Sequence, residues 1–132
     1  VSAPWFAALF QVASDRTNAL VDDEALRLTS SDRAGILLAM ADIVGEGLPS
    51  SLRSSAVHRL ALSQYDSALA IEPHASAWHN SAYMLLMLQD EQDVSLENIR
   101  ERLWSALKLE PSFEKSLQAC QALGLGLPPH AD

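Results

Sequence analysis

Residues 67–73 read SALAIEP and residues 105–111 read SALKLEP, so one seven-residue stretch occurs twice, the second copy beginning 38 positions after the first. Five of the seven positions are identical. Each copy ends in a proline, which cannot continue a helix, so each stretch is predicted to be the last turn of a helix. A repeat at this period is typical of arrays of stacked helical hairpins.

The similarity of the two segments extends to the apolar positions before each stretch. These positions follow the same steps of 4 and 3: Ala61, Tyr65 and Ala68 in the first segment, and Ile99, Leu103 and Ala106 in the second. Such steps place three side chains on one face of a helix. The small residue of each set, Ala68 or Ala106, is expected to let a neighbouring helix approach closely.

The bounds of all the helices are predicted from apolar periodicity and helix-breaking residues. We expect them at about residues 4–13, 17–28, 30–44, 51–71, 76–89, 95–109 and 113–123. The expected N-terminal caps are Ser30 or Ser31, Asp93 or Ser95, and Ser112. No segment alternates apolar and polar residues convincingly, so no strand is expected. The prediction is an all-α fold of about six to seven helices.

The spacing of Ala61, Tyr65, Ala68 and Pro73 resembles the tetratricopeptide repeat, a family built from helix pairs of about 34 residues. The stretch AWHNSA at residues 77–82 looks like the start of the first helix of such a pair. The resemblance implies an α-α superhelix of tetratricopeptide-like hairpins. The offset of 38 departs from the family pattern, and we expect the extra residues in the loop at 90–94.

The resemblance also divides the chain. Residues 30–124 would form degenerate repeats, with pairs at 30–71 and 76–109 and a terminal helix after them. Residues 1–29 match nothing in the repeat and are interpreted as N-terminal helices that cap an exposed end of the array. Residues 125–132, rich in glycine and proline, are predicted to be a flexible tail.

In the tetratricopeptide family, the inner face of the superhelix binds partners, and it comes mainly from the first helix of each pair. By resemblance, this face comprises His79, Asn80, Tyr83, Leu86 and Met87 in the second pair, and Arg33 and Leu37 in the first. Some family members clamp a carboxylate there. Of the three positions that we expect to carry a clamp, only Asn80 suits it, so we expect an apolar groove for a peptide or helix instead. Core packing is the alternative interpretation of Leu86 and Met87.

Two further surfaces are candidates for partner binding. Trp5 and Phe6 would form a partner-binding or dimerising patch if uncovered, and folding back onto the core is the alternative. A short array leaves apolar faces at its ends, so a homodimer is one arrangement that would cover them. Trp78 is interpreted as a packing residue between helix pairs.

Composition limits the partners. The chain has 132 residues, 48% of them apolar, and a formal net charge of −8. An acidic protein repels phosphate backbones and anionic lipids, so we expect neither nucleic-acid binding nor membrane docking, and a basic protein or peptide is the favoured partner. No apolar run reaches the roughly 20 residues of a spanning helix, so no membrane insertion is expected. The single cysteine, Cys120, is expected to be a buried thiol.

Catalytic patterns are absent from the sequence. No histidine lies three or four residues from another, and no nucleophile and base share a diagnostic spacing. We therefore expect no enzyme, cofactor or metal site, and an adaptor or assembly chaperone instead. The alternative is a regulatory or scaffolding domain excised from a larger protein. In one form of this alternative, the larger protein is an enzyme and this domain only positions it. A cytoplasmic location is expected, with a periplasmic or secreted one as the alternative.

Overall fold

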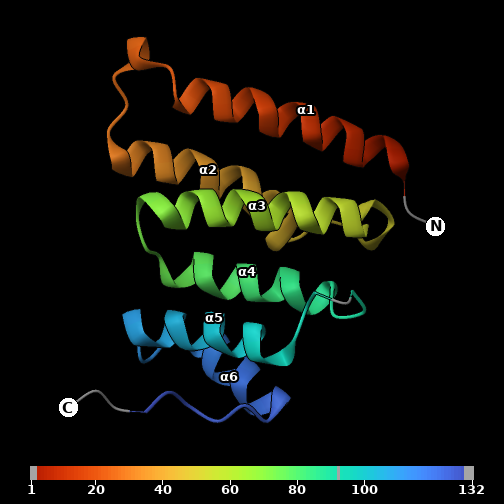
Figure 1. The fold of residues 1–132 in the computed structure, drawn as a ribbon, viewed down its shortest axis with the longest axis vertical. Helices are drawn as coiled ribbons and strands as arrows, with labels where there is room; N and C mark the ends of the chain where they lie inside the picture. Colours follow the sequence, from red (N-terminus) through yellow and green to blue (C-terminus); the bar gives the residue numbers. More distant parts are fainter. Residues whose placement is uncertain (1–2, 92, 130–132) are drawn as a thin grey trace.

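The structure, a computed structural model, describes residues 3–91 and 93–129. These residues form six α-helices and two short 3-10 turns and contain no strand, which confirms the all-α prediction (Figure 1). The α-helices are α1 (Pro4–Val21), α2 (Ser30–Gly45), α3 (Ser55–Ile71), α4 (Ala75–Met87), α5 (Leu96–Leu109) and α6 (Glu114–Leu123). The 3-10 turns are η1 (Glu24–Leu26) and η2 (Ser50–Leu52). None of the described helices is both long enough and apolar enough to span a membrane.

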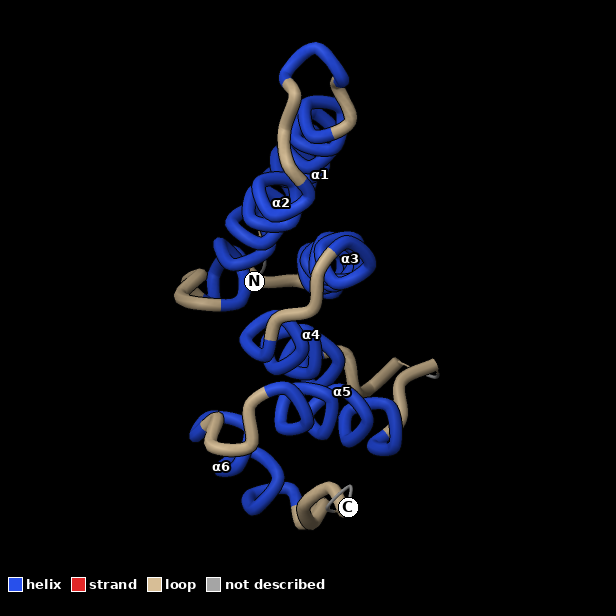
Figure 2. The backbone as a smooth tube through the Cα atoms, turned by 90° about the vertical axis from the view of Figure 1, so that its left-hand side faces the viewer, coloured by secondary structure: helices blue, strands red, loops and turns tan. Residues whose placement is uncertain are grey.

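The helices stack one above another along the long axis of the molecule (Figure 1). Consecutive helices pack as neighbours: α2 against α3, α3 against α4, and α4 against α5, while α1 packs against both α2 and α3. In the turned view, α2 and α6 lie to one side of the stack and α3 lies to the other (Figure 2). The short α6 packs against α5 and closes the lower end.

The two repeated segments occupy equivalent positions in α3 and α5. All six positions of the pattern are buried, with 2% or less of each residue exposed: Ala61, Tyr65, Ala68, Ile99, Leu103 and Ala106. Each helix ends three residues after its alanine, and a glutamate N–H, from Glu72 or Glu110, donates to that alanine's carbonyl at 3.0 or 2.9 Å. The repeat seen in the sequence is therefore a repeat of burial and of helix termination.

The prediction of two helices before residue 29 was wrong, because α1 continues from Pro4 to Val21. No glycine or proline interrupts it between residues 13 and 17. The Thr17 hydroxyl donates to the carbonyl of Ala13 at 2.8 Å, so a residue read as a helix start is accommodated inside the helix. After α1, the chain turns through η1, and Arg27 has a φ of 52°.

The helix starts also differ in part from the prediction. Thr29, and neither Ser30 nor Ser31, caps α2. Its hydroxyl oxygen accepts the Asp32 N–H at 3.0 Å, and the Asp32 carboxylate accepts the Thr29 N–H at 3.2 Å, which completes a capping box. Ser95 caps α5, as one of the two alternatives proposed.

The two other predicted starts are later than expected. The long helix begins at Ser55 and not at residue 51, because residues 50–52 form η2 and the Ser54 hydroxyl accepts the N–H of Val57. Phe113, and not Ser112, is the first residue before α6, and it makes no side-chain capping bond. Its ring packs instead against His79 of α4, at 5.7 Å between centroids.

A partly buried polar cluster joins α2, α3 and α4. The Tyr65 hydroxyl donates to Asp42 Oδ1 at 2.6 Å, and the Asn80 amide donates to the same oxygen at 3.2 Å and to Glu46 Oε1 at 3.3 Å. Burial and the bond to Asp42 raise the pKa of Tyr65, so the hydroxyl remains a donor. Gly45 leaves the space that the Tyr65 hydroxyl occupies. This cluster sets the position of α4 relative to the first helix pair.

Candidate functional site

Three of the predicted groove residues meet in one apolar pocket. His79, Tyr83 and Leu86 lie on one face of α4, since their positions are separated by 4 and 3 residues. The pocket has a volume of about 80 Å³, and α5 and α6 form its other walls. Its other lining residues are Ala82, Ile99, Leu103, Ala119 and Leu123. The pocket is therefore formed where three helices meet.

The size and lining of this pocket restrict what it can hold. Small-molecule sites usually measure roughly 300–1,000 Å³, so about 80 Å³ is too small for such a ligand. It has room for one aliphatic side chain. Carbon atoms of alanine, leucine and isoleucine make up most of the wall, and the polar groups come from His79 and Tyr83. Chemically, the pocket suits a single apolar anchor.

His79 holds α6 against α4. Its Nδ1 lies 2.8 Å from the hydroxyl oxygen of Ser116, which is completely buried on α6. Burial, and next the nearby Lys115, lower the pKa of His79, so the ring is neutral at pH 7. The neutral ring together with the Phe113 ring fixes the start of α6. This hydrogen bond keeps the α6 wall of the pocket in place.

Tyr83 is held by the connection between α2 and α3. The guanidinium carbon of Arg53 lies 5.6 Å from the centre of the Tyr83 ring. Arg53 in turn donates to the carbonyl oxygens of Val44 at 2.9 Å and Leu48 at 3.0 Å. One of its nitrogens also lies 3.2 Å from Nε2 of His58, whose pKa is lowered by burial and by Arg53. Tyr83 is consequently supported from outside its own helix pair.

The other predicted site residues lie outside the pocket. Asn80 is buried in the polar cluster, and Met87 is exposed one turn beyond Tyr83. Leu37 packs in the core beside Val21 and Ala68. Arg33 donates to the Val21 carbonyl at 3.1 Å and forms an ion pair with Asp22. The structure thus brings together His79, Tyr83 and Leu86 and separates them from the two residues of α2.

Sequence reasoning missed the contribution of α6. Ala119 and Leu123 form its wall of the pocket, and Ser116 anchors it, yet the helix was interpreted only as a cap at the end of the array. Their positions, 116, 119 and 123, are separated by 3 and 4 residues and so share one helix face. That spacing was the available signal. The partner of Ser116 on α4 had no signal in the sequence.

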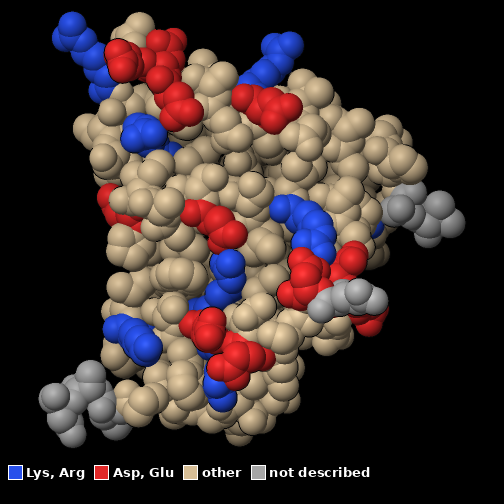
Figure 3. Space-filling model, viewed as in Figure 1, with Lys and Arg blue, Asp and Glu red and all other residues tan. Residues whose placement is uncertain are grey.

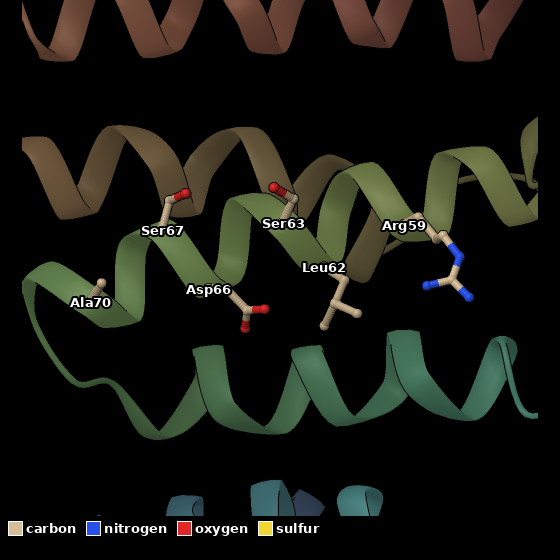
Figure 4. Close-up of a pocket in the computed structure, with 6 residues that line it drawn as sticks. All are labelled: Arg59, Leu62, Ser63, Asp66, Ser67 and Ala70. Atoms are coloured by element: carbon tan, nitrogen blue, oxygen red, sulfur yellow. The ribbon is translucent and has the colours of Figure 1, made fainter. Parts of the chain in front are cut away.

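Larger hollows lie elsewhere on the described part of the protein, and one of them has its main charged side chains already paired. This hollow, about 520 Å³, lies along the outer side of α3 (Figure 4). Its Arg59 forms an ion pair with Asp93 at 2.8 Å, and its Asp66 pairs with Arg102 at 2.7 Å. Acidic and basic side chains lie close together over this face of the molecule (Figure 3). Because these charges are paired within the protein, we place the candidate site at the pocket on α4.

The tryptophans and the cysteine have distinct environments. Trp78 is half-buried, and the Arg102 guanidinium of α5 lies 5.8 Å from its ring centre, a contact within the pair formed by α4 and α5. The Trp104 indole donates to the Gly126 carbonyl at 3.2 Å. Trp5 is exposed, whereas Phe6 packs partly against the core. Cys120 is completely buried, as expected, and burial raises the pKa of its thiol.

Comparisons with known proteins add no assignment. No protein-family model matches the chain, and neither the search of curated proteins nor that of solved structures gave a match. Within residues 3–91 and 93–129, no group of three or more His, Cys, Asp or Glu side chains is placed to hold a metal ion. The pocket formed by α4, α5 and α6 is therefore the basis for the function proposed next.

Proposed function

We propose that this chain is a tetratricopeptide-like adaptor or assembly chaperone, and that it binds a peptide or helix of a partner protein through the pocket between α4, α5 and α6. One observation carries the proposal: an apolar pocket, sized for one side chain, lies beside a partly buried hydrogen bond between His79 and Ser116 that joins α4 to α6. A preformed pocket lowers the ordering cost of binding.

The equivalence of α3 and α5 supports the tetratricopeptide-like interpretation. Each segment buries its small alanine, Ala68 or Ala106, at the same position before the end of its helix. In this interpretation, α2 with α3 and α4 with α5 are the two pairs, and α6 is the first helix after them. The pocket then lies on the first helix of the second pair, where family members bind their partners.

The chemistry of the pocket and the charge of the protein define the expected ligand. A single aliphatic side chain would enter the pocket and act as the anchor that supplies most of the binding energy. The net charge of −8 favours basic residues on either side of that anchor, because complementary charge speeds association and discriminates between partners. The proposed ligand is thus a basic segment with one leucine, isoleucine or valine anchor.

Filling the pocket tests the proposal. Peptides are selected from a random display library against the wild-type protein, and their affinity is measured by fluorescence anisotropy. The Ala119→Leu variant places a larger side chain in the pocket wall and should weaken binding at least about tenfold. The Ala122→Leu variant makes the same change on the exposed side of α6 and should bind like the wild type.

Circular dichroism of both variants confirms that α6 still forms. The selected peptides should share an aliphatic residue, and a His79→Ala, Tyr83→Ala double variant should lose their binding. If Ala119→Leu binds the peptides as well as Ala122→Leu does, the pocket is not the binding site and the proposal is wrong.

A further inference from the structure

The outer side of α1 carries a continuous row of apolar residues. Trp5, Leu9 and Val12 are 61%, 55% and 50% exposed, and the exposed Arg16 follows one turn later. Steps of 4, 3 and 4 place these four side chains on one face of the helix. We call these four residues the α1 row. Isolated apolar residues on a surface are ordinary, whereas a continuous row indicates an interaction surface.

The outer side of α2 carries a second row with the same spacing. It consists of Asp32, Ile36, Ala39 and Ile43, all exposed, with Ile36 at 38% and Ile43 at 51%. We call these residues the α2 row. The opposite side of α2 is buried in the core. A helix at the surface usually has one apolar side and one polar side, so α2, which is apolar on both, is expected to be covered on both.

The two rows are complementary when the helices run antiparallel. Because the steps 4, 3 and 4 read the same in both directions, each residue of one row faces one residue of the other. The facing residues are Arg16 and Asp32, Val12 and Ile36, Leu9 and Ala39, and Trp5 and Ile43. Opposite charges then meet, and the large Leu9 faces the small Ala39. In the parallel arrangement, Arg16 would face Ile43 and Asp32 would face Trp5, which would desolvate both charges without pairing them.

The charges that end the two rows are available for such a contact. Neither Arg16 nor Asp32 forms an ion pair with another described residue. Asp32 only accepts the N–H of Thr29 through Oδ2, at 3.2 Å. Both rows are exposed in the same chain, because α1 and α2 pack against each other and the core through their other faces. The rows can therefore meet only between two molecules.

We infer that this protein associates with a second copy of itself, the α1 row of one molecule packing antiparallel on the α2 row of the other. A two-fold axis makes the contact reciprocal, so that both rows of both molecules are covered. This arrangement accounts for the two exposed rows with one contact. It uses a surface separate from the pocket on α4 and does not depend on the function proposed for that pocket.

The small size of the contact determines its strength. Each molecule contributes five large apolar side chains, three on α1 and two on α2, and the small Ala39 lies between the latter two. We expect a contact made by so few side chains to lie near the lower end of the size range of specific interfaces, which bury about 1,200–2,000 Å² in total. We expect dissociation constants in roughly the micromolar range, so that the complex forms at the concentrations used for sedimentation.

Sedimentation equilibrium with charge-reversed variants tests the inference. The Arg16→Glu variant places two acidic residues opposite each other and should weaken association at least about tenfold. The Asp32→Arg variant should do the same, and the Arg16→Glu, Asp32→Arg double variant should recover most of the loss. Asp32 also completes the capping box of α2, so circular dichroism checks the helix content of the variants that change it.

An apolar pair of variants provides a matched control. Leu9→Glu should abolish association, whereas Leu96→Glu should not, although Leu9 and Leu96 are 55% and 53% exposed. A wild-type protein that stays monomeric at high concentration overturns the inference. If Asp32→Arg associates as strongly as the wild type, the inference is also wrong, because the α2 row would then take no part in the contact. If the double variant associates no more strongly than the two single variants, Arg16 does not pair with Asp32 as proposed.

Discussion

Replacing Gly45 with alanine should destabilise the protein, although alanine is the better helix former. Gly45 is the last residue of α2, and a Cβ there would lie far inside van der Waals contact with the Tyr65 hydroxyl. It would also lie 3.3 Å from Cζ of Tyr65 and 3.5 Å from Cβ of Asn80. Tyr65 is completely buried and hydrogen-bonded to Asp42, so the ring cannot move aside without losing that bond.

The size of the effect follows from these contacts. Inserting a methyl group into a packed site costs about 1–3 kcal/mol. Displacing the Tyr65 hydroxyl from the Asp42 carboxylate adds about 1.5–3 kcal/mol, the usual contribution of a hydrogen bond to a charged group. The higher helix propensity of alanine returns at most about 1 kcal/mol. We expect a net loss of about 2–4 kcal/mol in the free energy of unfolding.

Urea denaturation followed by circular dichroism measures this loss, and a second glycine of α2 is the control. Gly35 is exposed, and a Cβ there meets no atom within 4 Å, so Gly35→Ala should stabilise the protein by about 0.5–1 kcal/mol. The Tyr65→Phe variant removes the hydroxyl. In that background, Gly45→Ala should cost at least about 1 kcal/mol less than it does in the wild type.

Two results would refute this reasoning. If Gly45→Ala is as stable as the wild type, the close approach of Tyr65 to α2 does not exist in solution. If its cost is unchanged in the Tyr65→Phe background, the hydroxyl is not the group that the alanine displaces.

Two further predictions concern the repeat and the buried histidines. Ala68→Leu and Ala106→Leu should each lower the free energy of unfolding by about 1–3 kcal/mol, because both sites are fully packed. Ala70→Leu, on the exposed side of α3, should have little effect. Unequal losses for the two buried alanines in urea denaturation would contradict the equivalence of the two segments. Burial lowers the pKa of His79 and His58 below the ordinary histidine value of 6.5, so both side chains bind protons more readily in the unfolded protein. The free energy of unfolding should therefore be highest above about pH 6.5 and should fall as the pH drops below that value. The fall should be smaller in a His79→Gln variant. A free energy of unfolding that does not change between pH 8 and pH 5 would contradict this prediction.

Elements whose cause is local could be predicted from the sequence. Pro73 and Pro111 end α3 and α5 within two residues, because proline lacks the N–H and restricts the residue before it. The steps of 4 and 3 in both segments identified the buried faces of both helices correctly. Gly124 ends α6 with a φ of 66°, a conformation that glycine adopts without strain.

Elements that depend on competing local signals were predicted less well. Thr29, Ser30 and Ser31 are all competent caps, and only the reciprocal bond with Asp32 selects Thr29. Thr17 can begin a helix or lie within one, and its bond to Ala13 shows the second use. In these places, the residue type allows several structures of nearly equal free energy.

The candidate site shows a similar division. The spacing of His79, Tyr83 and Leu86 placed them on one face of α4, and the structure brings them into one pocket. Asn80, predicted for the same face, instead hydrogen-bonds to Asp42 and Glu46, which lie 38 and 34 positions away. Helix periodicity defines which side chains share a face, but it does not define what that face meets.

By itself, the sequence determined the helical class, the repeat of 38 residues, the two proline ends and the buried alanines, because each follows from interactions within a few turns of chain. The tertiary structure alone decided that α6 would close the pocket, that Ser116 would meet His79, and that the outer sides of α1 and α2 would stay uncovered. Those features depend on how whole helices pack. The free energy of that packing is the sum of many contacts between residues that lie far apart in the chain.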